Sequence, residues 1–204
     1  MQKLTYIPML LLLALLFSCG NSQNKTGLNL VMGSTADSSA MIAPQYAKGF
    51  NVKYADNITL LEINDPENKE AEQFHFALVD KSFKGEIPNG YTRLNIPIKS
   101  AICMTSLQLS NFLKLDIPEL GVGITSTRHL HNQKMNQQLK EGKTHKIGIE
   151  GNFDNEVIIA INPDVIFISP FKRGGYDAIR NVEIPMIPHL GYKELTPSGQ
   201  AEWI

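Results

Sequence analysis

The stretch from Asn152 to Ile168 constrains the fold most, because it predicts a helix start, a helix stop and a buried strand in immediate succession. Asn152 or Asp154 can cap a first helical turn by accepting hydrogen bonds from its free backbone N–H groups. Pro163 ends that helix, since the residue before a proline is pushed out of the α region. The continuous apolar run at 165–168 is typical of a parallel strand that is covered on both faces.

The same alternation extends over the second half of the chain. Short apolar runs predict strands at 100–104, 121–124, 146–149, 165–168 and 185–187, and apolar residues at helical spacing lie between them. Crossovers of this length join parallel strands through right-handed connections. Residues 97–204 are therefore expected to form a Rossmann-like α/β lobe with a parallel sheet.

A different pattern precedes this lobe. Alternating apolar residues predict strands near 50–54, 58–63 and 74–79, with turn residues between and after them. Residues 46–96 are expected to form a small antiparallel β extension. The predicted fold class is thus α/β, with a β-rich segment followed by a parallel-sheet lobe.

The N-terminus has the composition of a secretory signal over residues 1–18. Lys3 is basic, and the apolar segment 7–17 is too short to span a bilayer. The residues ending at Cys19 resemble a bacterial lipobox, which implies that Cys19 is lipidated and anchors the mature protein to a membrane. An ordinary cleaved signal or a short membrane helix is the alternative. Residues 19–45 are expected to be a tether followed by a segment without a clear period.

A specific resemblance starts at Gly151 and is carried mainly by residues 155–166. The run Asn-Glu-x-Ile-x-Ala-Ile-Asn-Pro-Asp-Val-Ile resembles a signature of the periplasmic substrate-binding proteins that serve iron-siderophore, haem and cobalamin ABC importers. Two later stretches, 184–187 and 197–204, resemble that family's next strand and its entry into a long connecting helix. Together these pieces extend the resemblance over roughly the second half of the chain.

The resemblance implies a function and a set of partners. It implies that the protein captures an iron chelate on the periplasmic side and delivers it to the permease of an ABC importer, without catalysis or a cofactor. Cobalamin and haem are alternative ligands of the same fold. In the family the signature glutamate, here Glu156, lies on the outer surface and pairs with permease arginines. A glutamate that is simply favoured by the helix dipole is the alternative interpretation.

The family also has a second α/β lobe, which closes the ligand cleft. The sequence reaches Ile204 where the helix leading to that lobe would begin. We therefore expect a chain truncated to the N-terminal lobe, which would bind ligand weakly because one wall of the cleft is absent.

Ligand-lining candidates follow the predicted strands, because open α/β sheets bind ligands at the carboxyl ends of their strands. Basic side chains among them suit an anionic ferric chelate or a propionate-bearing haem. Solvated loop residues are the alternative for each. The candidates are Thr105, Ser106, Arg128, His129, Phe171, Lys172, Arg173, His189 and Tyr192.

Other classes of function find less support. The net charge of -1 argues against a nucleic-acid partner. His129 and His131 have the spacing of a metal pair but no acidic or cysteine partner nearby, so no metal site is expected. Gly121 and Gly123 lack the rest of a dinucleotide fingerprint, and no serine lies in a nucleophile motif. A nucleotide-dependent α/β enzyme and a lipoprotein remnant without transport activity remain the alternatives of another class.

Overall fold

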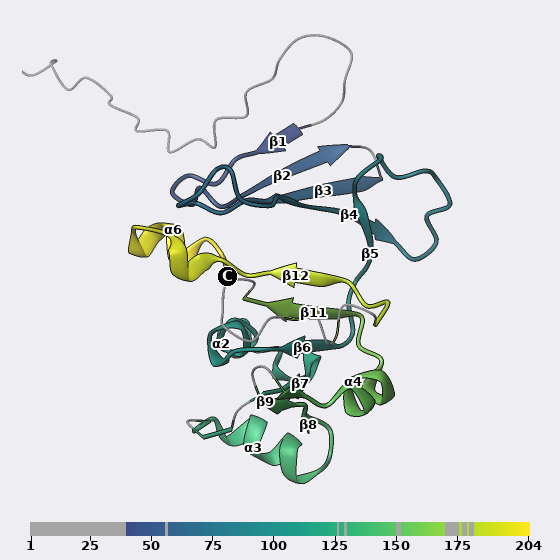
Figure 1. Cartoon of the computed structure of the whole chain (residues 1–204), viewed down its shortest axis with the longest axis vertical. Helices are drawn as coiled ribbons and strands as arrows, with labels where there is room; N and C mark the ends of the chain where they lie inside the picture. The colour runs from purple at the N-terminus through teal and green to yellow at the C-terminus, as the bar shows by residue number, and fades with distance from the viewer. Residues whose placement is uncertain are drawn as a thin grey trace, which may run out of the picture. The chain divides into compact units, whose positions relative to one another are not determined.

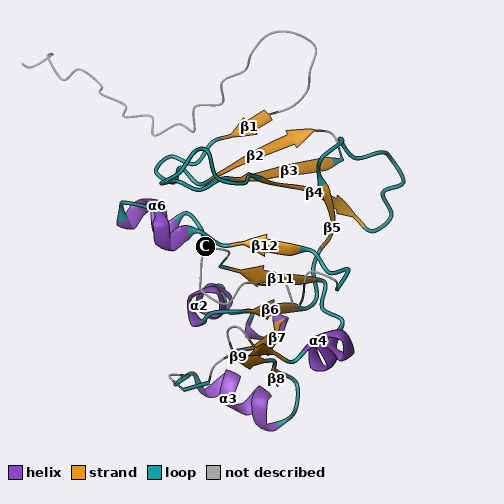
Figure 2. Ribbon diagram, in the orientation of Figure 1, coloured by secondary structure: helices purple, strands orange, loops and turns teal. Residues whose placement is uncertain are grey.

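The computed structural model contains two five-stranded sheets, which we call sheet A and sheet B (Figure 1). Sheet A lies in the first half of the chain, and the described helices accompany sheet B (Figure 2). The structure describes residues 40–55, 57–125, 127–128, 130–149, 152–169, 176, 179 and 182–204. The protein is therefore an α/β protein, as the alternation of sequence patterns predicts.

Sheet A has the strand order β1-β2-β3-β4-β5. The first four strands pair antiparallel, and β2, β3 and β4 confirm the three strands that the alternating apolar residues predict, whereas β1 was not predicted. The last strand, β5, instead runs parallel to β4, so the chain crosses over between Asp80 and Thr92 without a described helix. The bounds are β1 Ala40–Ile42, β2 Phe50–Ala55, β3 Ile58–Ile63, β4 Phe74–Asp80 and β5 Thr92–Ile96.

Sheet B is parallel throughout, with the order β12-β11-β6-β7-β8. Numbered along the chain, this order reads as a doubly wound fold, with the first strand in the middle and later strands added on both sides. The strands are β6 Ala101–Cys103, β7 Gly121–Ile124, β8 His145–Lys146, β11 Val165–Ile168 and β12 Met186–Pro188. The accompanying helices are α2 Ser106–Lys114, η2 Pro118–Leu120, α3 Gln133–Lys140, α4 Asn155–Ile161, η3 Gly191–Lys193 and α6 Pro197–Ala201.

The predicted strand at 146–149 is wrong in one respect. The chain leaves sheet B after Lys146, and β9 (Gly148–Ile149) pairs antiparallel with β10 (Asn152–Phe153). Gly148 has φ +89, which glycine adopts without the cost that a side chain would bring. The positive φ of Gly148 therefore turns the chain out of sheet B, although the apolar residues at 146–149 suggested one continuous strand.

Helix α4 forms as its sequence predicts. Asp154, rather than Asn152, is the N-cap, and its Oδ1 accepts from Val157 N at 3.1 Å. Asn162 ends the helix in the left-handed region with φ 47, which asparagine tolerates better than most residues. Pro163 follows and prevents a further turn.

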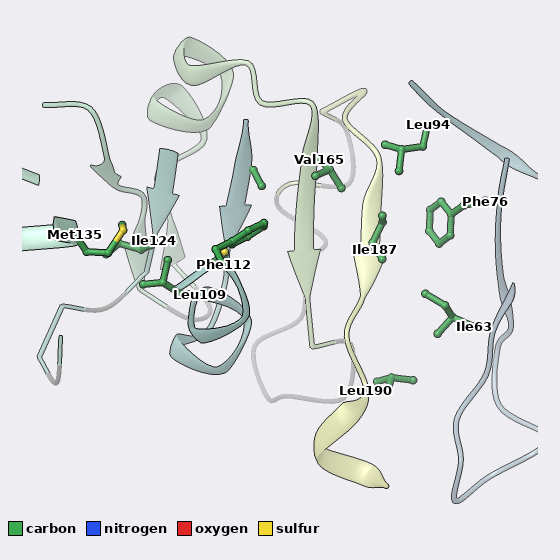
Figure 3. Close-up of a cluster of buried hydrophobic side chains, with 12 residues drawn as sticks. Ile63, Phe76, Leu94, Leu109, Phe112, Ile124, Met135, Val165, Ile187 and Leu190 are labelled. Carbon is green, nitrogen blue, oxygen red and sulfur yellow. The ribbon is translucent and has the colours of Figure 1, made fainter. Parts of the chain in front are cut away.

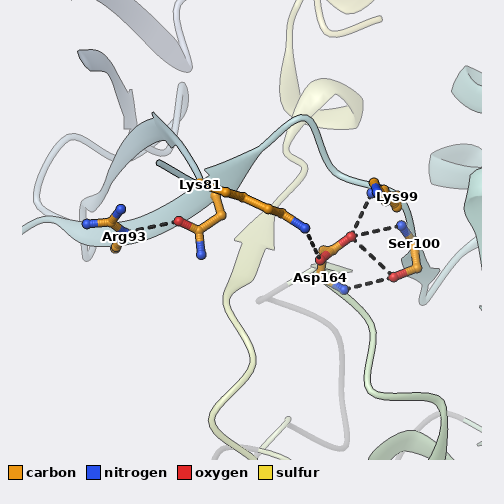
Figure 4. Close-up of polar contacts among 6 residues, drawn as sticks. Lys81, Arg93, Lys99, Ser100 and Asp164 are labelled. Atoms are coloured by element: carbon orange, nitrogen blue, oxygen red, sulfur yellow. Dashed lines mark hydrogen bonds and ion pairs between the residues drawn. The ribbon is translucent and has the colours of Figure 1, made fainter. Parts of the chain in front are cut away.

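Asp164 then ties α4 to the start of β6. Its Oδ2 accepts from Lys99 N at 2.6 Å and Ser100 N at 3.1 Å, and Lys81 Nζ lies 3.8 Å from Oδ1 (Figure 4). The Asn-Pro-Asp run therefore has a local structural role, because it ends the helix and aligns β11 beside β6.

Both faces of sheet B are buried, in keeping with the continuous apolar run of β11. Val165 and Phe167 belong to one cluster, whereas Ile166 and Ile168 belong to another. The first cluster also contains side chains of sheet A, so the sheets share a core (Figure 3). Sheet A contributes Ile63, Phe76 and Leu94 to it.

Candidate functional site

The candidate site lies at the carboxyl edge of sheet B, between β6 and β11. These adjacent strands begin connections that run to opposite sides of the sheet, and such a switch point is where open α/β sheets bind ligands. Thr105 and Ser106 follow β6, Ser169 follows β11, and His189 follows β12. The fold thus brings together residues from three strand ends that are far apart in the sequence.

Buried polar side chains hold the two loops at this switch point together. Gln108, which is 2% exposed, donates from Nε2 to Ser169 Oγ at 3.3 Å. The same side chain accepts from Thr105 N at 3.0 Å, and Thr105 Oγ1 accepts from Gln108 N. This reciprocal capping box leaves Thr105 a positioning role. The Thr-x-x-Gln spacing was a sequence signal for Gln108, whereas nothing local indicated its contact with Ser169.

His189 is buried beside this edge, with 8% of its surface exposed. Asn111 Nδ2 lies 2.8 Å from His189 Nε2; with the amide as donor, Nε2 accepts and the ring proton lies on Nδ1. Burial lowers the pKa of His189, so the ring is neutral near pH 7. Nδ1 has no partner among the described residues. Because the ring is neutral and Nε2 already accepts a hydrogen bond, His189 is suited to contact a ligand as an uncharged side chain of the pocket wall.

Two apolar hollows adjoin His189, with volumes of about 200 and 110 Å³. Both are lined by Phe167, His189, Trp203 and Ile204. Sheet A closes the larger one with Phe50, Leu61 and Ile63. No lysine or arginine lines either hollow, so the described walls offer apolar and aromatic contact rather than positive charge.

The remaining sequence candidates have varied positions. Ser106 is exposed in the first turn of α2, Arg128 is exposed in the loop after β7, and Tyr192 is 41% exposed on η3. None of these three lines the two hollows. The other predicted residues, Cys19, His129, Phe171, Lys172 and Arg173, lie outside the described residues.

Two carboxylates hold the segment that joins β1 to β2 in sheet A, and no sequence pattern indicated either of them. Glu202 accepts from the backbone N–H groups of Gln45, Tyr46 and Ala47 at 2.6 to 3.0 Å. Glu194 Oε1 accepts from the next two N–H groups, those of residues 48 and 49, at 2.9 Å each. Five consecutive backbone donors are thus satisfied by side chains from the end of the chain.

An ion pair and a ring contact complete this junction. Lys193 pairs with Asp65, which is 3% exposed, and Trp203 packs edge-on against Phe50 with ring centroids 5.0 Å apart. The junction therefore fixes Trp203, which lines both hollows, against sheet A.

Glu156 lies in the first turn of α4 and is exposed. It lines neither hollow and forms no ion pair with a described residue. Its position is compatible both with a helix-dipole role and with an external partner.

The described residues do not form a metal site, a dinucleotide-binding turn or a reactive thiol. Among them, no three His, Cys, Asp or Glu residues cluster to hold a metal ion. Gly121 and Gly123 lie inside β7, where a Cβ on Gly123 would come within 2.6 Å of Ile102 Cγ1. These glycines allow close strand packing. Cys103 is buried, and burial raises its pKa to about 12, which gives an unreactive thiol.

The fold and this edge define a doubly wound α/β protein with two apolar hollows beside His189, close to its switch point. No family model matches the chain. The chain is similar to an uncharacterized lipoprotein of Methanocaldococcus jannaschii, with 27% identity over 135 residues. The match covers 59% of this chain and 31% of that relative, so the chain spans under a third of the relative's length. Within the described residues, no helix is long and apolar enough to cross a membrane.

Proposed function

We propose that this α/β lobe belongs to the substrate-binding component of an ABC importer, which captures an iron chelate and delivers it to a membrane permease. The observation that carries the proposal is the pairing of apolar hollows near the switch point with a separate exposed carboxylate, Glu156, on the signature helix α4. One part of such a lobe can contact ligand while the other contacts the permease. The resemblance of the run 155–166 to the importer family supports the same assignment.

The walls of the hollows favour a ligand with an apolar or aromatic part. Phe167, Trp203 and Phe50 offer ring surface, and His189 is neutral. A ferric chelate with ring substituents has such surface, and cobalamin and haem are the alternative ligands. Capture and release need no bond to form or break, so we propose a binding protein and not an enzyme.

The proposal includes a lipid anchor at Cys19 on the periplasmic side of a bacterial membrane. The lipobox-like sequence before Cys19 and the name of the archaeal relative, a lipoprotein, support it. Metabolic labelling with a radioactive fatty acid should mark the wild-type chain and leave Cys19→Ser unlabelled. Equal labelling of the two would exclude Cys19 as the anchor.

Ligand binding is tested through Trp203, the single tryptophan of the chain. Its ring lines both hollows, so a bound chromophore should quench its fluorescence. We would titrate a ferric catecholate, a ferric hydroxamate, haem and cobalamin, and repeat any positive titration by equilibrium dialysis. Saturable quenching with a Kd below about 10 μM for one of them supports the proposal. Failure of all four probes would contradict it for this chain.

A matched pair of variants tests whether a ligand held in the hollows also extends to the switch point. Ser106 and Ser110 both lie on α2 outside its buried stripe, but only Ser106 follows directly on the carboxyl edge of β6. Ser106→Glu should weaken binding of an anionic chelate about tenfold by charge repulsion, whereas Ser110→Glu should leave it unchanged.

A further inference from the structure

The size of the larger hollow limits what can enter it. Ile63 from sheet A and Ile187 from β12 both line it, and Figure 3 shows them on facing sides of the shared core. Its volume of about 200 Å³ is close to that of an engineered apolar cavity of about 150 Å³ that binds benzene. Clefts that enclose a drug-sized ligand are larger, at about 300 to 1,000 Å³. The hollow therefore has room for one small ring and not for a whole chelate, haem or corrin.

Aromatic side chains already meet edge to face around this space. Trp203 packs edge-on against Phe50 with ring centroids 5.0 Å apart, and the His189 ring is tilted against the same indole at 5.3 Å. Phe167, which also lines the hollow, is edge-on to Phe112 at 5.8 Å. Aromatic rings gain affinity from such contacts beyond the area that they bury. An aromatic ligand can extend this arrangement, whereas a saturated ring can only fill the space.

The charges at the wall disfavour an anion. Glu202 lines the larger hollow and accepts from three backbone N–H groups, and no lysine or arginine of the described chain lines it. His189 is neutral near pH 7, and its Nε2 is engaged by Asn111. An anionic group in this hollow would lose its water and gain no cation in return. The group that enters must therefore be uncharged.

We propose that the larger hollow binds one uncharged aromatic ring, which belongs either to a small molecule or to a substituent of a larger ligand. The inference rests on the proposed function only for the second source. In that case the charged metal centre of the chelate stays outside the hollow, and the ring substituent is the part that contacts Trp203. Ring chemistry, and not the metal, then decides which ligands this wall accepts.

The test follows the indole N–H of Trp203, because the single tryptophan of the chain gives one indole signal in a heteronuclear NMR spectrum. The full chain is titrated at neutral pH with benzyl alcohol, cyclohexylmethanol and benzoate. These probes are similar in size but differ in aromatic character and charge.

A matched pair of variants places the probe. Leu61 lines the larger hollow and pairs with Phe76, whereas its neighbour Leu60 pairs with Ala77 on the opposite face of sheet A. Leu61→Phe puts a ring of the protein's own into the hollow, and Leu60→Phe makes the same change outside it. Thermal melting checks that each variant is folded, and the probe series on the wild-type chain decides the question if Leu61→Phe is not.

We expect benzyl alcohol to bind with a Kd of about 1 mM or lower. Cyclohexylmethanol should bind at least about twofold more weakly, and benzoate at least about tenfold more weakly. Leu61→Phe should weaken the binding of benzyl alcohol about tenfold, and Leu60→Phe should leave it unchanged. The inference is overturned if benzyl alcohol does not bind, if benzoate or cyclohexylmethanol binds as tightly, or if a folded Leu61→Phe variant binds as well as wild type.

Competition with the chelates separates the two sources of the ring. A chelate that binds and displaces benzyl alcohol would support both the ring site and the importer. Binding of benzyl alcohol without binding of any chelate, haem or cobalamin would support a site for a small aromatic molecule and count against the importer. A chelate that binds while benzyl alcohol does not would overturn the ring site and leave the importer standing.

Discussion

Trp203 Nε1 donates a 3.0 Å hydrogen bond to Glu194 Oε1, the oxygen that also accepts from two backbone N–H groups just before β2 of sheet A. One buried carboxylate therefore links the aromatic wall of the candidate site to the first strands of the protein. Because Trp203 lines both hollows, the shape of the site depends on a contact that lies outside it.

Removal of this carboxylate should be costly. Glu194 is 5% exposed, and Glu194→Ala would leave three donors without an acceptor. We expect a loss of about 2 to 4 kcal/mol in the free energy of unfolding, since each stranded buried donor costs about 1 to 3 kcal/mol and water reaches some of them. Urea denaturation measures it. The control Glu72→Ala, at an exposed position, should change the value by less than about 0.5 kcal/mol, and equal effects would refute the assignment.

Acid should weaken the same junction. Burial raises the pKa of Glu202, but the backbone N–H groups of residues 45, 46 and 47 lower it by more, so the folded pKa lies below the ordinary 4.5. The pKa of Asp65 is also lowered, with burial opposed by hydrogen bonds from Lys193 and the backbone. A carboxylate whose pKa is lower in the folded than in the unfolded protein stabilises the fold at any pH above its unfolded-state pKa. That stabilisation is lost as the pH falls through its folded-state pKa.

The pH dependence is checked by urea denaturation at about pH 7 and about pH 3. We expect Glu202→Gln to be less stable than wild type at the higher pH, with a smaller difference at the lower pH. A difference that does not shrink on acidification would show that the Glu202 charge is not what the junction uses.

Gly148 should tolerate substitution less well than Gly142, although both have positive φ. A Cβ on Gly148 would come within 2.5 Å of Asn152 O, whereas one on Gly142 would meet nothing within 4 Å. Gly142→Ala should cost about 1 to 2 kcal/mol from backbone conformation alone. Gly148→Ala should cost at least about 2 kcal/mol more, because the β9–β10 hairpin must shift. Thermal unfolding compares the two, and similar melting temperatures would contradict the hairpin geometry.

Asp164 and its ion-pair partner should differ in importance. Asp164→Ala removes the acceptor for Lys99 N and Ser100 N, and we expect a loss of about 2 kcal/mol. Lys81 Nζ lies 3.8 Å from Asp164 and is half exposed, so Lys81→Ala should cost less than about 0.5 kcal/mol. Equal losses in urea denaturation would mean that the ion pair, and not the backbone contacts, aligns β6 with β11.

Much of sheet B could be predicted, because its signals are local. The cap at Asp154, the stop at Pro163 and the apolar run of β11 each lie within a few residues of the structure they specify. The split between β8 and β9 escaped prediction because it depends on one glycine with positive φ inside an apolar run. The parallel pairing of β5 escaped it because strand direction leaves no mark on side-chain alternation.

The candidate site divides in the same way. Its place at the carboxyl ends of the strands, and the residues Thr105, Ser106 and His189 there, follow from the order of the elements. The apolar hollows could not be predicted, because their walls come from strands of both sheets and from the last residues of the chain. The buried contact between Gln108 and Ser169 could not be predicted either, because it joins residues that are far apart in the sequence.

The sequence by itself determined the α/β class, the parallel lobe and helix α4 with Glu156 in its first turn, since each depends on neighbours within one or two turns or strands. Only the tertiary structure decided how the two sheets meet. Glu202 and Glu194 reach backbone donors 145 to 157 residues away, and a carboxylate has no local feature that distinguishes such a contact from an exposed charge. Burial beside a distant segment gives these two side chains their role, and that burial exists only after the chain has folded.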